Sequence, residues 1–82
     1  MEQQAIAACT ESINKKFTDA SISDTNLELV TSYSETREWE YTGTITGTSN
    51  ITKKPITTRF KCLVFYFGSK KEFKAVAIPE SY

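Results

Sequence analysis

The sequence predicts an α+β domain in which one N-terminal helix packs on one face of a four-stranded antiparallel meander. Apolar residues recur with a helical period up to about residue 17. After residue 26 the period changes to two, and β-branched and aromatic residues become frequent. The connections between the predicted strands are short, which favours antiparallel neighbours. We therefore expect the order αββββ, with residues 1–82 forming a single domain.

The first predicted element is an amphipathic helix from Glu2 to about Phe17. Its apolar stripe has spacings of three, four and four residues, and Ala5 and Ala20 widen the stripe. The segment 18–26 is rich in Ser, Thr and Asp, so we expect it to be the loop that leaves the helix. The residues of the stripe are Ile6, Cys9, Ile13 and Phe17.

Four strands are predicted to follow, at Leu27–Ser34, Glu38–Gly47, Ile56–Phe67 and Glu72–Ile78. In the last hairpin we expect Tyr66 opposite Phe73, Val64 opposite Ala75 and Cys62 opposite Ala77. These residues share one face, which we assign to the core because its small residues leave room for a helix. The same face contains Trp39, Tyr41, Gly43, Ile45 and Phe60.

The opposite face of the predicted sheet is polar on one side and apolar on the other. Near the second strand it shows Glu40, Thr42, Arg59 and Lys61, and a register with Glu40 opposite Lys61 would pair acid with base. Near the last hairpin it shows more apolar surface than a solvated sheet face requires. This apolar group consists of Leu63, Phe65, Phe67, Val76 and Ile78.

Two interpretations of the apolar group are open. The chain could cover it with its own tail, Pro79–Tyr82, or with the segment 18–26. Alternatively, the group is a binding surface for a second copy of the chain or for another protein, and we favour this interpretation. If the last strand is also an edge of the sheet, the partner could add a strand as well as cover the face.

Two cysteines, Cys9 and Cys62, fall on the core sides of the predicted helix and third strand, so the fold brings them together. A disulfide would close a loop of about 53 residues. Such a bond contributes about 4 kcal/mol on the chain-entropy estimate and implies an oxidising compartment. The alternative is two reduced cysteines that pack as small apolar side chains. We favour the disulfide.

The composition excludes several classes of function. The chain contains no histidine, which rules out imidazole metal sites and catalysis by Ser-His-Asp or Cys-His groups. Ten basic and ten acidic residues give a net charge of zero, so there is no long-range attraction to nucleic acid or to an anionic membrane. Residues 1–40 carry eight acids and three bases, and residues 41–82 carry seven bases and two acids. We expect these halves to neutralise each other within the sheet.

No group of residues indicates catalysis or a cofactor. Glu38 and Glu40 share a strand face, but we expect them to pair with Arg59 and Lys61. Two thiols without histidine are too few ligands for a metal site. The pairs Lys53-Lys54 and Lys70-Lys71 fall in connections at opposite ends of the sheet, which disperses their charge, so we expect solvated turns and no nucleic-acid site. The N-x-T pattern at Asn50 has meaning only in a eukaryotic secretory setting. We therefore expect no enzyme, no cofactor and no metal.

Three motifs carry a resemblance to known proteins. They are A-x-x-A-C-x-x-x-I-x-x-x-F-x-x-A from Ala5, Y-x-G-x-I from Tyr41 and R-F-x-C-x-V from Arg59. Together they resemble a diffuse group of small uncharacterised bacterial and phage proteins, often exported or tethered behind a membrane helix, with one cysteine in the helix and one in a late strand. The chain differs in having Thr18-Asp19 where a proline is expected, and in lacking an export signal. The resemblance supports the fold and the cysteine pairing, and the shape is also cystatin-like.

These features predict a non-enzymatic interaction domain of bacterial or phage origin. We expect it to act in an oxidising, exported compartment and to bind itself or another protein through the apolar group. The alternative is a cytoplasmic phage inhibitor with reduced cysteines that blocks a host enzyme by surface contact. We expect no nucleic-acid partner, and no membrane insertion because no segment has the roughly 18 consecutive apolar residues of a membrane span.

Overall fold

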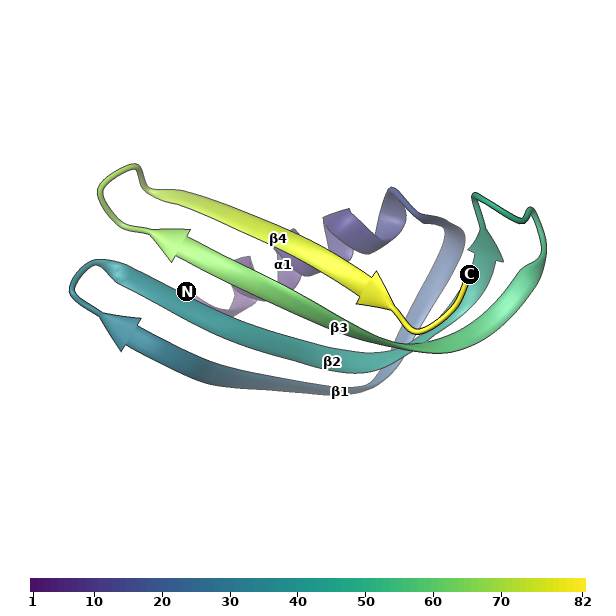
Figure 1. Cartoon of the computed structure of the whole chain (residues 1–82), viewed down its shortest axis with the longest axis horizontal. Coiled ribbons are helices and arrows are strands. Elements are labelled where there is room, and N and C mark those ends of the chain that lie inside the picture. Colours follow the sequence, from purple (N-terminus) through teal and green to yellow (C-terminus); the bar gives the residue numbers. More distant parts are fainter.

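The predicted αββββ order is present in the computed structural model, which describes all 82 residues. Helix α1 comprises Glu2–Asn14, and the strands are β1 (Phe17–Tyr33), β2 (Thr36–Ser49), β3 (Pro55–Phe67) and β4 (Glu72–Pro79). The strands form one antiparallel sheet in the order β1-β2-β3-β4. Figure 1 looks onto one face of the sheet, with α1 behind it. We call the face that contacts α1 the inner face and the other the outer face.

Helix α1 is shorter than predicted. The prediction extends too far because the apolar stripe of the helix continues into the next strand. The helix ends at Asn14, and just beyond it the Lys16 N–H donates to the Ile13 carbonyl. Phe17 is predicted to end the helix, whereas it begins β1 and is still only 2% exposed. Its side chain belongs to the same buried core as Cys9 and Ile13. Helical spacing alone therefore does not reveal where this helix stops.

The segment 18–26 is the first half of β1, so the prediction of a loop is wrong. It pairs with residues 42–48 of β2. Its polar composition suits a strand here because β1 lies at an edge of the sheet and most of these side chains are exposed. Asp19 and Asp24 take positive φ at two irregularities of this pairing. Aspartate enters that backbone region more readily than most residues, and β-bulges use it.

The sheet registers agree with the prediction in one hairpin and differ in another. Between β3 and β4, Cys62 lies opposite Ala77 as predicted. Between β2 and β3, Glu40 lies opposite Leu63 and not opposite Lys61. The predicted ion pair still forms, with Lys61 Nζ 3.6 Å from Glu40 Oε1. Diagonal neighbours on one sheet face are within reach of such long side chains.

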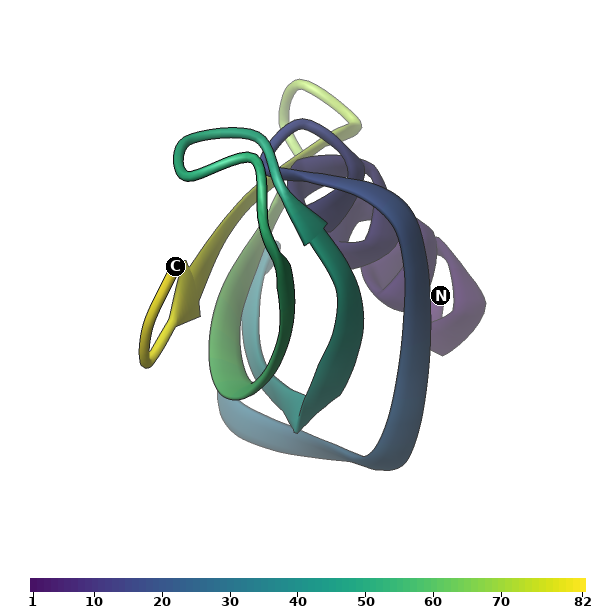
Figure 2. The same cartoon turned by 90° about the vertical axis from the view of Figure 1, so that its right-hand side faces the viewer.

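The hydrophobic core lies between α1 and the inner face, as the periodicity predicts. Figure 2 shows the curvature of the sheet from its end, with α1 on the concave side. Gly43 lets β1 approach closely, since a Cβ there would lie 2.9 Å from the Ser23 carbonyl oxygen. The core residues are Ala5, Cys9, Ile13 and Phe17, together with Trp39, Tyr41, Ile45, Phe60, Cys62, Val64 and Ala77 from the later strands.

A disulfide joins Cys9 in the middle of α1 to Cys62 in β3, as predicted. The two Cα atoms are 6.1 Å apart, within the usual range for this bond. Both cysteines are completely buried. The bond fixes the helix to the strand that carries three of the five residues in the apolar group.

The Asn50 side chain ties the turn after β2 to the junction between α1 and β1. Its Nδ2 donates to the Lys15 carbonyl at 3.2 Å, and its Oδ1 accepts the Thr18 hydroxyl at 2.6 Å. The Asn50 backbone N–H also donates to the carbonyl of Lys16. These contacts give Asn50 a structural role that is independent of the N-x-T pattern.

Asn50→Ala is expected to lower the free energy of unfolding by about 1 to 2 kcal/mol, because it removes two side-chain hydrogen bonds. Thr52→Ala is the matched control. It destroys the same N-x-T pattern, yet Thr52 is exposed and bonds only through its backbone N–H, to Ser49 Oγ. Urea denaturation of both variants measures the difference. Equal stability losses would contradict the structural role of Asn50.

Candidate protein-interaction surface

The predicted apolar group lies together on the outer face, which is turned toward the viewer in Figure 1. We call it the outer patch; it consists of Leu63, Phe65 and Phe67 of β3 and Val76 and Ile78 of β4. Leu63 lies directly opposite Val76. The rings of Phe65 and Phe67 stack with their centroids 6.4 Å apart. Val76 and Ile78 are 45% and 52% exposed, and the three residues of β3 are partly exposed.

The outer patch is backed by a fixed part of the core. Side chains alternate along β3, so Cys62 and Val64 point inward on either side of Leu63. Both inward side chains are completely buried, and Cys62 is bonded to α1. The backbone beneath the patch is therefore held in place before any partner binds, which reduces the ordering cost of binding.

No segment of the chain covers the outer patch. The tail packs elsewhere, because the Ser81 N–H donates to Oγ1 of buried Thr58 and Tyr82 stacks on Phe17. Thr58 lies opposite the core residue Ile45, so the tail turns to the inner side. The segment 18–26 belongs to β1, at the other edge of the sheet from β4. Neither the tail nor the segment 18–26 therefore covers the outer patch.

The edges of the sheet are poorly suited to strand addition. On the β4 edge, the Ala77 N–H donates to Ser12 Oγ of the helix at 3.0 Å, and Pro79 has no N–H to offer. On the opposite edge, β1 contains three register irregularities. Such irregularities interrupt the row of backbone groups that an added strand would need. A partner is thus better accommodated on the outer face than at either edge.

Opposite charges border the outer patch. Glu38 of β2 lies opposite Phe65, which in turn lies opposite Lys74 of β4. Neither Glu38 nor Lys74 has an ion-pair partner, since the single ion pair of the structure joins Glu40 and Lys61. The patch therefore has an unpaired negative charge on one side and an unpaired positive charge on the other.

The sequence does not reveal that Glu38, Phe65 and Lys74 lie in one row across the sheet. The predicted register between β2 and β3 differs from the observed one by two residues. It predicts Arg59 as a partner for the β2 carboxylates. In the structure, Arg59 lies opposite Thr44 and donates to its hydroxyl at 3.2 Å. Glu38 is left beside Phe65 instead. The β3–β4 hairpin, which is predicted correctly, places Phe65 beside Lys74, but no local signal in the sequence places Glu38 beside Phe65.

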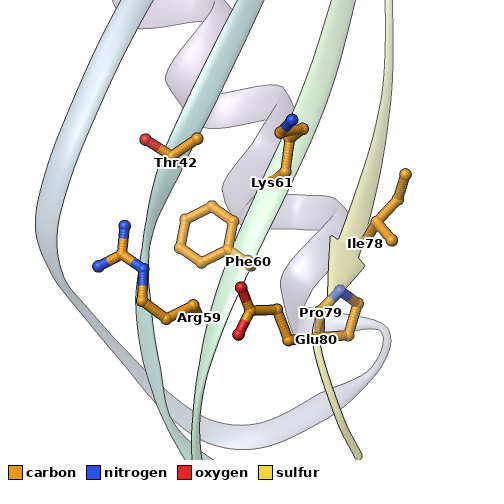
Figure 3. Close-up of a pocket in the computed structure, with 7 residues that line it drawn as sticks. All are labelled: Thr42, Arg59, Phe60, Lys61, Ile78, Pro79 and Glu80. Atoms are coloured by element: carbon orange, nitrogen blue, oxygen red, sulfur yellow. The ribbon is translucent and has the colours of Figure 1, made fainter.

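A shallow hollow adjoins the outer patch near Ile78 (Figure 3). Its volume is about 350 Å³. Both cationic side chains around it already have partners. Arg59 donates a hydrogen bond to the Thr44 hydroxyl, and Lys61 forms an ion pair with Glu40. The hollow therefore extends the candidate surface beyond Ile78. It is lined by Thr42, Arg59, Phe60, Lys61, Ile78, Pro79 and Glu80.

No cluster of three or more His, Cys, Asp or Glu side chains could hold a metal ion. Both cysteines are used in the disulfide, and none is free. Helix α1 has 13 residues, and the structure contains no helix with the length and apolar character needed to cross a membrane.

No protein-family model, curated protein or solved structure matches this chain. The resemblance to small bacterial and phage proteins therefore stays an expectation from the sequence motifs. The outer patch is the strongest candidate for a functional surface on the molecule.

Proposed function

We propose that this protein is a non-enzymatic interaction domain that binds protein through the outer patch. The proposal is carried by one observation: five apolar side chains gather on a sheet face that no segment of the chain covers. Contiguous exposed apolar patches on soluble domains mark interaction sites. The stacked rings of Phe65 and Phe67 are the expected anchors, because a few central side chains, often aromatic, supply most of the binding energy of an interface.

We also propose that the domain acts in an oxidising compartment, outside the cytoplasm. The Cys9–Cys62 disulfide supports this, since such bonds persist in exported proteins and are rare in the cytosol. A cytoplasmic inhibitor would have to keep both thiols reduced. Intact mass of the chain from its native source, alkylated before and after reduction, tests the point. Full alkylation without reductant would contradict the exported location.

Phe65→Lys is expected to abolish partner binding while the domain stays folded. A tagged wild-type chain, incubated with an extract of its source, should retain a defined protein. That protein is either a different chain or an untagged copy of this one. Phe65→Lys should retain it at least about 30-fold less well, the effect of losing a central anchor residue. Quantitative mass spectrometry of the retained proteins measures the ratio.

Thr57→Lys is the matched control for this experiment. It adds the same charge to the same face of the same strand, but Thr57 is exposed and lies outside the outer patch. It should retain the partner as the wild type does. Retention of the same protein by Phe65→Lys, or equal loss in both variants, would contradict binding through the outer patch.

A further inference from the structure

We infer that the partner of the outer patch is a second copy of this chain, packed face to face about a twofold axis that runs along β3. The inference rests on the proposed function and names its partner. It is carried by the row in which Glu38, Phe65 and Lys74 lie side by side on β2, β3 and β4. An apolar residue stands at the centre of this row, with opposite charges one strand away on either side.

A twofold axis parallel to β3 exchanges the two sides of that strand. It places β2 of one copy over β4 of the other, at the same level along the strands. Phe65 then meets Phe65 of the second copy, and Glu38 meets Lys74 of the second copy. Because the axis is twofold, this ion pair forms twice. The outer face is therefore complementary to itself: opposite charges meet, and the apolar centre meets its own counterpart.

An axis running across the strands has the opposite effect. It keeps β2 over β2, so the carboxylates of Glu38 and Glu40 would face those of the second copy. Like charges brought together in an interface oppose association. Among face-to-face arrangements of two copies, the charges on the outer face thus favour the axis along β3.

The charges near the centre of the outer face are compatible with this arrangement, and Arg59, which also faces outward on β3, lies six residues from Phe65 toward the other end of the strand. Glu38 and Lys74 have no partner within the chain, so association gains two ion pairs and breaks none. Lys61 would approach its own counterpart near the axis, but Glu40 lies 3.6 Å away and compensates it. The zero net charge of the chain removes long-range repulsion between copies. Two sheets packed at the usual angle of about 30° stay in contact along such an axis.

The molecule has the size that a standard dimer interface requires. Its two longer extents, which lie in the plane of Figure 1, are 43 and 22 Å. A standard interface buries about 800 Å² on each partner. That area is about 15% of the 5224 Å² of accessible surface of the single chain.

Sedimentation equilibrium of the disulfide-bonded chain over a concentration series tests the inference. We expect a concentration-dependent mass that rises from 9.3 kDa to twice that value. Glu38→Lys and Lys74→Glu should each raise the dimer Kd about tenfold or more, because each puts two like-charge contacts into the interface. The double variant should return to within about threefold of the wild type, because both ion pairs re-form with reversed sign. Thr57→Lys should leave the Kd unchanged.

The outcomes separate this inference from the proposed function. A wild-type chain that stays at 9.3 kDa up to about 1 mM overturns self-association. If, in that case, the wild type retains a protein from the extract and Phe65→Lys does not, the outer patch binds a partner other than a second copy. A dimer in which the double variant is no better than the single variants overturns the axis along β3. A dimer that is unaffected by Phe65→Lys forms through another surface and overturns the inference.

Discussion

Replacing both cysteines, as Cys9→Ala/Cys62→Ala, is expected to lower the free energy of unfolding by about 4 kcal/mol. The disulfide closes a loop of 53 residues, and a long loop restricts the unfolded chain strongly. A domain of 82 residues has a total stability of only about 4 to 12 kcal/mol. The loss is therefore a large part of the whole, and the variant should be close to unfolding at 37 °C.

Thermal unfolding followed by circular dichroism measures this effect. In a domain of this size, about 4 kcal/mol corresponds to a fall of roughly 15 to 30 °C in Tm. The wild-type chain, when heated in the presence of a reductant, should have a Tm similar to that of the variant. If the Tm of both stays at the value of the oxidised wild type, the disulfide is not the main link between α1 and β3.

Ile13→Ala has the second largest expected effect, a loss of about 2 to 5 kcal/mol in the free energy of unfolding. Ile13 is completely buried between α1 and the inner face. Truncation loses apolar burial and leaves a cavity that the disulfide-linked surroundings close only in part. Urea denaturation at a single protein concentration gives the value.

Ile78→Ala makes the same chemical change on the outer face and is the matched control. Ile78 is 52% exposed, and its side chain lies in the outer patch. The free energy of unfolding should fall by less than about 1 kcal/mol, the range of strand propensity alone. Equal losses at Ile13 and Ile78 would show that both faces of the sheet contribute core, contrary to the division described above.

Much of the fold follows from local patterns in the sequence. The helical stripe, the alternation along β3 and β4 and the short last turn together predict the pairing of Cys62 with Ala77. They also predict that Cys9 and Cys62 meet, because each lies in the middle of a face that must be buried. The five residues of the outer patch follow from the same alternation, read on its other side.

The rest depends on contacts that are distant in sequence. The segment 18–26 has loop-like composition, and only its place at the sheet edge opposite β2 makes it a strand. The β2–β3 register is fixed by the packing of the whole inner face, so the longer turn between these strands does not predict it. The hydrogen bond from Ala77 to Ser12 closes part of the β4 edge across 65 residues, and no local signal announces it.

The inner and outer faces thus have separate tasks in this account. The inner face, with the disulfide and the buried aliphatic and aromatic side chains, stabilises the domain. We propose that the outer patch contributes less to stability than the inner face and that it binds protein. The most direct test of this central claim is the free energy of unfolding of Phe65→Lys, measured in urea at a concentration low enough for the chain to be monomeric.

We expect Phe65→Lys to lie within about 1 to 2 kcal/mol of the wild type, because it loses the stacking on Phe67 and part of its burial but no contact within the core. Thr57→Lys should lose less, since Thr57 is exposed. A loss of several kcal/mol in Phe65→Lys, comparable with that of Ile13→Ala, would contradict the account. Such a loss is the signature of a buried core position and would show that the outer patch belongs to the core.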